Sequence, residues 1–571
     1  MSLAGLAIDC YSIELASLVL LILIASSISH SLFSTYSNIY AQGEKGSSSI
    51  SNDSCIEYDS EHQIITIECE SANLTDIHNQ LRYPGVLEKA ESLPSGNVWL
   101  LDAAIIIKKG ATLHINSTDT SWLKIVAPDR GVANEEREDT ESPVAKANGI
   151  EVFGSLKIDS VKVTSWNLSS NNYAMNEGQR GFKGAEYDVQ LGSPRPFISV
   201  KEQATGTTDI TNSELAYLGY EDGFGKGPVV GLTYVGGSGS VIKNNNIHHL
   251  YFALYSNGAR DLTIENNRFH HNRQYGIDLH TGTHNTMIRN NLVHDNGGQG
   301  IICSLDCFNI TIEGNKVYRN SGSGIMFSRN MQDSIARNNT VLDETECIFV
   351  SSSHNNQIYN NTVSECSNAG LYLKAGSTYN LLHDNIVMNS EKGIFVDNKS
   401  SSNKFYKNTI MTNSPQSAIV LDDHHYGRIS DRESNSNNMK NNTFVNNKIV
   451  PAPEVSITYP TSDQNILPGI LTIYGTSWHG NSTSCQVSIL LNNKQPYQDA
   501  IATGPGGKND FSKWTFTFDP MYSVIQEGSN EITARVVCQY EDGSDFSPVN
   551  YNTIIVTAAR PNGDNSNNYI L

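Results

Sequence analysis

Charged residues, and positive charge above all, are scarce in this chain of 571 residues. Asp, Glu, Lys and Arg make up 17% of it, and 39 basic against 59 acidic residues give a formal net charge of -20. Globular proteins usually carry about a quarter of charged residues. Bulk binding of nucleic acid requires a basic surface, so the charge argues against that function. Any site for an acidic polymer must therefore have a local cationic lining.

The chain also lacks an apolar run long enough for a comfortable membrane span. The N-terminal apolar stretch covers only residues 15–25, whereas a spanning helix needs about 20 apolar residues. The stretch fits the apolar part of a signal peptide with Ala41 as a small residue for cleavage, although Asp9 and Glu14 precede it instead of Lys or Arg. We expect residues 1–41 to be a signal peptide or, if uncleaved, a membrane anchor. The protein is then secreted, periplasmic or at the cell surface.

A zinc-type cysteine pattern is missing too. Removing Cys10 with the leader leaves eight of the nine cysteines, an even number that fits an oxidising compartment. Cys303 and Cys307 have neither a second cysteine pair nor suitably spaced histidines, so no metal site is expected. Ten N-glycosylation sequons are compatible with an exported glycoprotein. Two disulfides are predicted from the isolation of their cysteines in sequence, namely Cys55–Cys69 and Cys485–Cys538.

The chain is instead rich in a repeat of about 23 residues. In one series of similar segments, a glycine or its replacement recurs at positions 276, 300, 324, 347, 370, 393 and 418. In a second series, an asparagine followed two residues later by an apolar residue recurs at positions 245, 267, 291, 315, 339, 361, 385 and 408. One unit cannot bury its apolar residues alone, so the units must stack, with strands about 4.8 Å apart. The repeat predicts an all-β fold with a right-handed parallel β-helix over residues 95–445.

The composition changes on either side of this repeat. Residues 42–94 are expected to form a spacer and a small N-terminal segment. Residues 452–558 alternate apolar and polar positions, and Cys485, Trp514 and Cys538 are spaced as in an immunoglobulin-like β-sandwich. We expect a separate C-terminal sandwich there and a flexible tail over residues 559–571.

The segment Tyr275-Gly276-Ile277-Asp278-Leu279-His280 departs from its repeats by its polar residues. Because side chains alternate along a strand, Ile277 and Leu279 should face the core, and Asp278 and His280 should project outward with Tyr275 nearby. Stacked polar residues on such a fold are usually solvated surface. A Tyr–Asp–His cluster surrounded by further histidines is less ordinary, and it is what acid–base chemistry requires.

The same segment resembles the Tyr-Gly-x-Asp-Pro-His signature of mannuronan (alginate) C5-epimerases. Similarity to this family extends over roughly residues 95–425 and includes segments 161–166, 195–198, 210–219, 292–296 and 300–304. Leu279 replaces the family's proline, and Thr281 stands where the family has a fourth, acidic residue. Ser304 and Gly322 stand where the secreted members have an acid and an arginine.

The resemblance implies an exported enzyme that acts on an anionic polysaccharide by C5 epimerisation. Separately, we expect the protein to be a monomer. No cofactor is required, and calcium is not indicated because the nonapeptide calcium repeats of secreted members are absent. Tyr275 and His280 would be the acid–base pair, with the base unassigned, and Asp278 would hold His280 or bind the carboxylate. Arg319 is our first choice for neutralising that carboxylate. The expected substrate-binding residues are His248, His271, His294, Arg273 and Arg329.

Other functions remain open. Expulsion of the 4-O-glycosidic oxygen from the same intermediate would make the protein a lyase. A non-catalytic glycan-binding protein would also retain the β-helix, and the missing neutralising positions support that alternative. A purely structural cell-surface protein is a further alternative, supported by the sandwich domain and the sequons.

Overall fold

The computed structural model describes residues 54–90, 97–127, 147–175, 194–220, 230–422, 441–478, 484–492, 494–518, 524–539 and 549–559. The expected leader, the spacer over residues 42–53 and the tail beyond residue 559 lie outside these ranges. No helix within them is long and apolar enough to cross a membrane.

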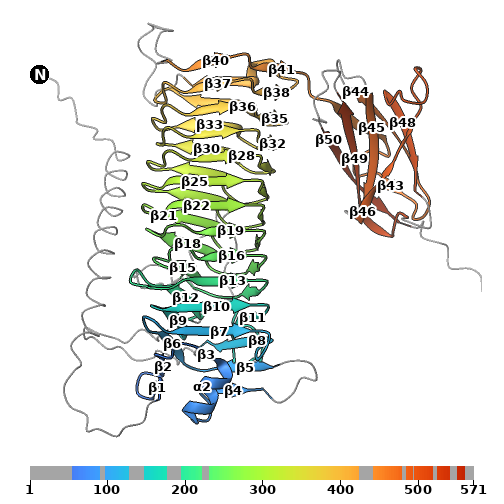
Figure 1. The fold of residues 1–571 in the computed structure, drawn as a ribbon. Coiled ribbons are helices and arrows are strands. Elements are labelled where there is room, and N and C mark those ends of the chain that lie inside the picture. The colour runs from blue at the N-terminus through green and yellow to red at the C-terminus, as the bar shows by residue number, and fades with distance from the viewer. Residues whose placement is uncertain are drawn as a thin grey trace, which may run out of the picture. The chain divides into compact units, whose positions relative to one another are not determined.

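Most of the described chain winds into stacked coils, each of which adds one strand to each of three sheets (Figure 1). The strands pair in parallel except at the N-terminal edges of two sheets, where the first pair is antiparallel. We name the sheets A, B and C in the order in which the chain passes them. Sheet A contains β1 (Ile56–Asp59), β2 (Ile64–Ile67), β6 (Ala104–Ile107), β9 (Gly149–Val152), β12 (Phe197–Val200), β15 (Leu232–Tyr234), β18 (Leu254–Asn257), β21 (Ile277–His280), β24 (Ile301–Ser304), β27 (Ile325–Ser328), β30 (Glu346–Ser351), β33 (Ala369–Lys374), β36 (Lys392–Asp397) and β39 (Ile419–Asp422).

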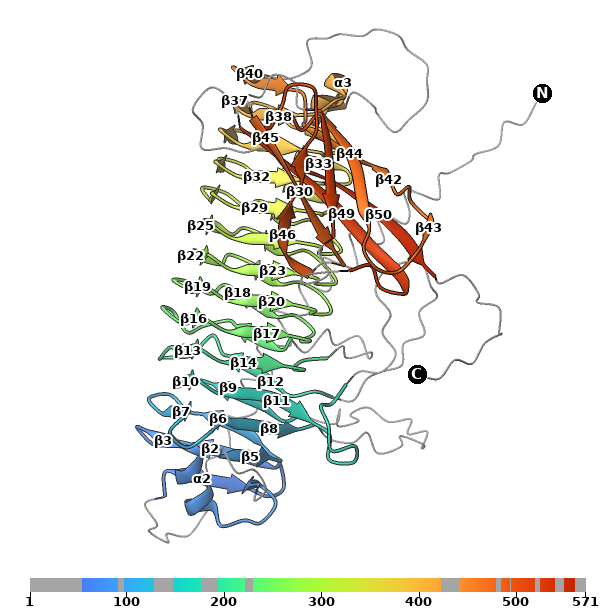
Figure 2. The ribbon, with the colours of Figure 1, turned by 90° about the vertical axis from the view of Figure 1, so that its right-hand side faces the viewer.

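Sheets B and C also gain one strand from each coil, and the view turned by 90° shows their strands stacked coil by coil (Figure 2). Sheet B contains β3 (Ala72–Asn73), β7 (Thr112–Asn116), β10 (Ser155–Asp159), β13 (Thr208–Thr211), β16 (Val241–Lys243), β19 (Thr263–Glu265), β22 (His284–Arg289), β25 (Phe308–Glu313), β28 (Ile335–Arg337), β31 (Gln357–Tyr359), β34 (Leu381–His383), β37 (Lys404–Tyr406) and β40 (Thr443–Val445). Sheet C contains β4 (Leu87–Lys89), β5 (Val98–Leu101), β8 (Trp122–Val126), β11 (Lys162–Trp166), β14 (Glu214–Ala216), β17 (Asn246–His248), β20 (Arg268–His270), β23 (Leu292–His294), β26 (Lys316–Tyr318), β29 (Thr340–Leu342), β32 (Thr362–Ser364), β35 (Ile386–Met388), β38 (Thr409–Met411) and β41 (Lys448–Val450).

The core is built from columns of apolar side chains that repeat once per coil. Ile277 pairs with Ile301, and the column continues through Ile325, Ile348, Leu371 and Ile394. All six side chains are almost completely buried. The parallel β-helix and the register expected from the repeat are therefore confirmed.

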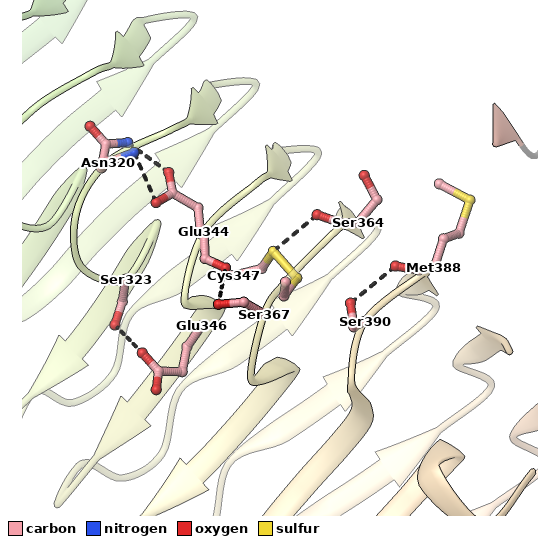
Figure 3. Close-up of a disulfide and its surroundings, with 10 residues drawn as sticks. Asn320, Ser323, Glu344, Glu346, Cys347, Ser364, Ser367, Met388 and Ser390 are labelled. Atoms are coloured by element: carbon pink, nitrogen blue, oxygen red, sulfur yellow. Dashed lines mark hydrogen bonds between the residues drawn. A yellow bond between two sulfur atoms is a disulfide. The ribbon is translucent and has the colours of Figure 1, made fainter. Parts of the chain in front are cut away.

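Asparagine ladders close the turns between sheets B and C. The Asn291 amide donates to Asn315 Oδ1 at 3.0 Å and to the Ile264 carbonyl at 2.9 Å, and Asn291 Oδ1 accepts from Asn267 in the same way. The residue before each such asparagine has a positive φ, as at Asn290, which Asn tolerates better than most residues. A second ladder, at the turn after sheet C, ends where Glu344 accepts from Asn320 (Figure 3).

The β-helix begins earlier than the predicted boundary at residue 95. Strand β2 already pairs in parallel with β6, and α2 (Leu74–Leu81) follows β3 with a capping box at Asn73. Leu74 and Ile77 of this helix are buried in the same core cluster as the coils. The segment over residues 54–90 is therefore the first part of the β-helix. At its other end, the short α3 (Pro415–Ala418) precedes β39, and the last coil reaches Val450.

The described residues between 454 and 558 form two antiparallel-rich sheets around a separate core that contains Trp514. One sheet has the order β42 (Glu454–Tyr459), β44 (Thr472–Trp478), β48 (Lys513–Thr517), β47 (Ile501–Ala502), and the other β43 (Asn465–Ile466), β50 (Val549–Ala558), β49 (Gly528–Gln539), β45 (Ser484–Leu491), β46 (Lys494–Asp499). The expected β-sandwich is present. Its disulfide differs from the immunoglobulin pattern, because Cys485 and Cys538 face each other on neighbouring strands of one sheet rather than joining two sheets.

The structure contains both disulfides predicted from the sequence and a third between Cys347 and Cys366 (Figure 3). The third joins the start of β30 to the segment after β32, and the sequence analysis did not identify it. Cys303 and Cys307 remain free and buried. Disulfides of this number are typical of proteins from oxidising compartments.

Candidate active site

The candidate site is built on β21, in the middle of sheet A. In the register of the sheet, Asp278 lies between Tyr255 of β18 and Ile302 of β24, and His280 lies between Asn257 and Ser304. Ile277 and Leu279 are fully buried in the core, as alternation requires. The outer side of β21 therefore presents Asp278 and His280, as the sequence predicts.

Asp278 is not the solvent-facing group that alternation alone suggests, because its neighbours cover it. The residue is only 3% exposed, and its Oδ1 is buried without a hydrogen-bond partner among the described residues. This burial raises the pKa of Asp278 to about 7, although the positive charge of Arg329 opposes the rise. A buried carboxyl with an unused oxygen, titrating near neutral pH, is a candidate for hydrogen bonding or proton transfer to a ligand.

His280 is held by its two ring nitrogens. Nδ1 lies 2.6 Å from Thr281 Oγ1, and Nε2 lies 3.0 Å from Arg329 Nη2. Because a guanidinium can only donate, Nε2 is the acceptor and the ring proton sits on Nδ1. Burial, assisted by the charge of Arg329, lowers the pKa of His280 to about 4. The imidazole is therefore neutral at neutral pH, with its basic nitrogen turned to the arginine.

Arg329 reaches this position from two coils away. It follows β27 with a positive φ of 50°, and its Nε donates to Ser304 Oγ at 2.8 Å on the intervening coil. Ser304 thus accepts from Arg329 and helps to hold its guanidinium beside the histidine.

The other two candidate arginines lie elsewhere. Arg319, our first choice from the sequence, follows β26 of sheet C and forms two 2.8 Å bonds to Asp295. Arg273 lies over the ring of Tyr251, with its guanidinium carbon 5.8 Å from the centroid. The order of preference is therefore corrected: Arg329, not Arg319, is the arginine beside His280.

Tyr275 stands just before β21 and is half-buried. Its ring meets Phe252 edge-on at 5.2 Å between centroids. A Cβ at position 298 would lie only 2.4 Å from Tyr275 Cδ1, so the glycine of the next coil makes room for this ring. Burial, with a smaller contribution from Asp278, raises the pKa of Tyr275, so that its hydroxyl remains protonated at neutral pH.

The predicted substrate-binding histidines do not join His280. The rings of His248, His270 and His294 stack on sheet C at spacings of 5.0 and 5.2 Å, and Tyr318 continues the stack at 4.8 Å. His271 follows β20 and lies beside this column. The turn over residues 271–276 separates the column from β21, so these residues line a different sheet from the candidate site.

The register placed Ser304 near the site, but its role as a hydrogen-bond acceptor for Arg329 was not predicted, and Tyr255 was missed altogether. Tyr255 precedes Asp278 by one coil, and the centroids of the Tyr255 and His280 rings are 5.8 Å apart. Burial, assisted by Asp278, raises the pKa of Tyr255 to about 12. The register of the repeat could have located Tyr255, since it lies one coil before Asp278 in sheet A.

Comparison with known proteins supports the fold. Residues 230–387 match the family model described as "Right handed beta helix region", and residues 329–482 match "Periplasmic copper-binding protein (NosD)". Within the described ranges, no group of three or more His, Cys, Asp or Glu side chains is placed to hold a metal ion. The described residues therefore offer no set of ligands for a copper ion. No curated protein sequence matches the chain.

Solved structures with a similar fold include the periplasmic alginate epimerase AlgG, with 18% identity, a TM-score of 0.50, and coverage of 68% of this chain and 85% of that one. A double mutant of AlgG gives a TM-score of 0.51 with the same identity and coverage. The A-module of the Azotobacter vinelandii mannuronan C-5 epimerase AlgE6 is 15% identical over 62% of this chain and 89% of that one, with a TM-score of 0.37. At 18% identity the likeness to AlgG establishes the fold alone, and with the family model it shows that the chain contains a right-handed parallel β-helix.

Proposed function

We propose that this protein is an exported polyuronate C5-epimerase, with mannuronan as its model substrate. The observation that carries the proposal is the contact between the neutral His280 and Arg329, beside the buried carboxyl of Asp278. Removing the C5 proton of a uronate requires a base, an acid on the opposite sugar face and a group that neutralises the carboxylate. The side chains around β21 can fill these three roles.

His280 is suited to be the base. Its Nε2 lone pair is occupied by Arg329 while no substrate is bound. A substrate carboxylate competes for the guanidinium, because a charge-assisted pair is stronger than a bond to a neutral imidazole. Binding of the carboxylate therefore frees Nε2 to accept the C5 proton.

Tyr275 is suited to be the acid, since its raised pKa keeps the hydroxyl protonated. After His280 takes the C5 proton, the electron pair moves into the carboxylate carbon–oxygen system, where Arg329 and the protonated form of Asp278 donate hydrogen bonds that stabilise the added charge. Tyr275 then returns a proton to C5 from the other face, and solvent exchange restores both groups. If the electron pair instead expelled the 4-O substituent, an unsaturated chain end would result.

The test is a time course of purified protein with polymannuronate, followed by proton NMR. We expect guluronate signals to grow without signals of unsaturated ends. General acid–base groups contribute about 10²–10⁴-fold each, so His280→Ala and Tyr275→Phe should lower the rate by at least about 100-fold. His354→Ala, at a half-buried histidine bonded to Gln332 on another turn, is the matched control and should keep the wild-type rate.

The outcomes separate the alternatives. Unsaturated ends in place of guluronate would identify a lyase, and neither product would favour a binding or structural protein. Full activity of the His280→Ala protein would show that the base lies elsewhere.

A further inference from the structure

Sheet C carries a polar surface that the proposed chemistry does not use. We define the lane as the outward residues of β17, β20, β23 and β26 together with the residue after each strand. Its members are Asn246, His248, His249, Arg268, His270, His271, Leu292, His294, Asp295, Lys316, Tyr318 and Arg319. The lane contains three cations and one acid, whereas acids outnumber bases 59 to 39 in the whole chain. The lane is therefore a local exception to a strongly negative molecule.

Two of its cations are available to a ligand. Arg268 and Lys316 are exposed and form no ion pair with an acid among the described residues. Arg268 donates from Nε to His294 Nε2 at 3.0 Å, which leaves its other guanidinium donors for a ligand. Arg319 is already paired with Asp295.

The two cations are spaced for a sugar polymer. In the register of sheet C, Arg268 pairs with Leu292, and Leu292 with Lys316. Two coil spacings place the cations about 10 Å apart, close to the length of a disaccharide. The half-buried Leu292 between them offers an apolar patch to a sugar ring.

The imidazoles add acceptors for hydroxyl groups. His270 Nε2 lies 2.9 Å from Asn246 Oδ1 and therefore donates, so its Nδ1 must accept from His271 Nδ1 at 2.8 Å. The same reasoning, through Glu214, gives His249 a protonated Nδ1 bonded to His248. The Nε2 atoms of His249 and His271 are thus acceptors without a hydrogen-bond partner among the described residues.

These features favour a carboxylated polysaccharide over a nucleic acid. The rings of His248, His270, His294 and Tyr318 stack on one another at 4.8–5.2 Å, so the faces between them are occupied. The rings of His249 and His271 stack at 5.7 Å in the same way. Base stacking requires free ring faces. Duplex DNA also carries one charge per about 1.7 Å, a density that two unpaired cations do not match.

We propose that the lane is a second polyuronate-binding surface, separate from the candidate active site, in which Arg268 and Lys316 bind alternate carboxylates and His249 and His271 accept sugar hydroxyls. This proposal rests on the proposed function only for the identity of the polymer. A surface of this kind holds a long chain while another part of it is processed, so that the effective concentration of the chain at the active site rises.

The test is the Kd of the full exported chain for a long oligomannuronate at low ionic strength, with a neutral mannan of similar length alongside. Exposed ion pairs each contribute a factor of a few, so Arg268→Gln with Lys316→Gln should weaken binding about tenfold. Lys404→Gln with Lys407→Gln removes two exposed cations from another face and is the matched control. The wild-type protein should not bind the neutral polymer.

Unchanged binding in the Arg268/Lys316 variant, an equal loss in the control variant, or equal binding of the neutral mannan would each overturn the proposal. Turnover of a short oligomer, measured on the same proteins, should be the same in wild type and the lane variant. Loss of long-chain binding in a protein that shows no turnover would support the lane while refuting the proposed reaction.

Discussion

Replacement of Arg329 tests the geometry of the candidate site directly. The pKa of His280 lies at about 4, against 6.5 for a free imidazole, with burial as the larger cause and Arg329 as the smaller. The arginine therefore accounts for less than half of the difference, and Arg329→Gln should raise the pKa of His280 by at most about 1, which corresponds to ~1.4 kcal/mol. Burial should still keep the pKa of His280 below 6.5 in this variant.

The assay is a histidine-selective NMR titration of the folded protein, with His280→Ala used to assign the resonance. Arg319→Gln is the matched control, because that arginine pairs with Asp295 on another sheet and should leave the pKa of His280 unchanged. If turnover is present, the acid limb of kcat/KM should move to higher pH in Arg329→Gln, because a base works only when unprotonated. An unchanged pKa of His280, or an equal rise in the Arg319 variant, would refute the contact and the role derived from it.

Three further predictions concern stability. Asn291→Ala leaves the Ile264 carbonyl and two donors of Asn267 unpaired in a buried ladder, so urea unfolding should show a loss of about 3 kcal/mol or more; an effect below about 0.5 kcal/mol would contradict the ladder's role. Burial raises the pKa of Glu344 from 4.5 to about 9. Between these two values the folded state holds a proton that the unfolded state releases, so the stability of the wild type falls as the pH rises through this window. Glu344→Gln removes this loss and should raise the melting temperature at pH 8 more than at pH 5. Burial lowers the pKa of His270 from 6.5 to about 3, so between these values the unfolded state binds a proton that the folded state does not, and the wild type loses stability as the pH falls. The stability of His270→Gln should therefore fall less than that of the wild type over this window. Parallel stability curves of the two proteins would contradict the low pKa of His270.

The sequence predicted the architecture because the physical cause is periodic. A column such as Ile277, Ile301 and Ile325 recurs once per coil, and its spacing specifies both the parallel pairing and the inward face. The asparagines at the turns follow the same period. Neither the apolar column nor the asparagine ladder depends on the direction that a long side chain takes, so both could be predicted from the sequence alone.

The site was less accessible to sequence reasoning. Strand alternation placed Asp278 and His280 on the outer face, but exposure depends on the size and direction of neighbouring side chains, and Asp278 proved to be buried. Arg329 acts across two coils through a long side chain, and its direction is set by a left-handed residue that the repeat does not reveal. The Cys347–Cys366 disulfide was missed for a similar reason, since it joins the start of β30 to the segment after β32, and the period does not give the distance between these two places.

The most direct test of the account is the isotope at C5. Polymannuronate incubated with the purified protein in deuterium oxide should acquire deuterium at C5 of the residues whose configuration inverts, because His280 removes a proton and Tyr275 returns one that has exchanged with solvent. The label should be absent with His280→Ala and present with His354→Ala. Inversion without deuterium at C5, or no label in any residue with the wild-type protein, would contradict the proposal that the side chains around β21 transfer a proton to and from the sugar.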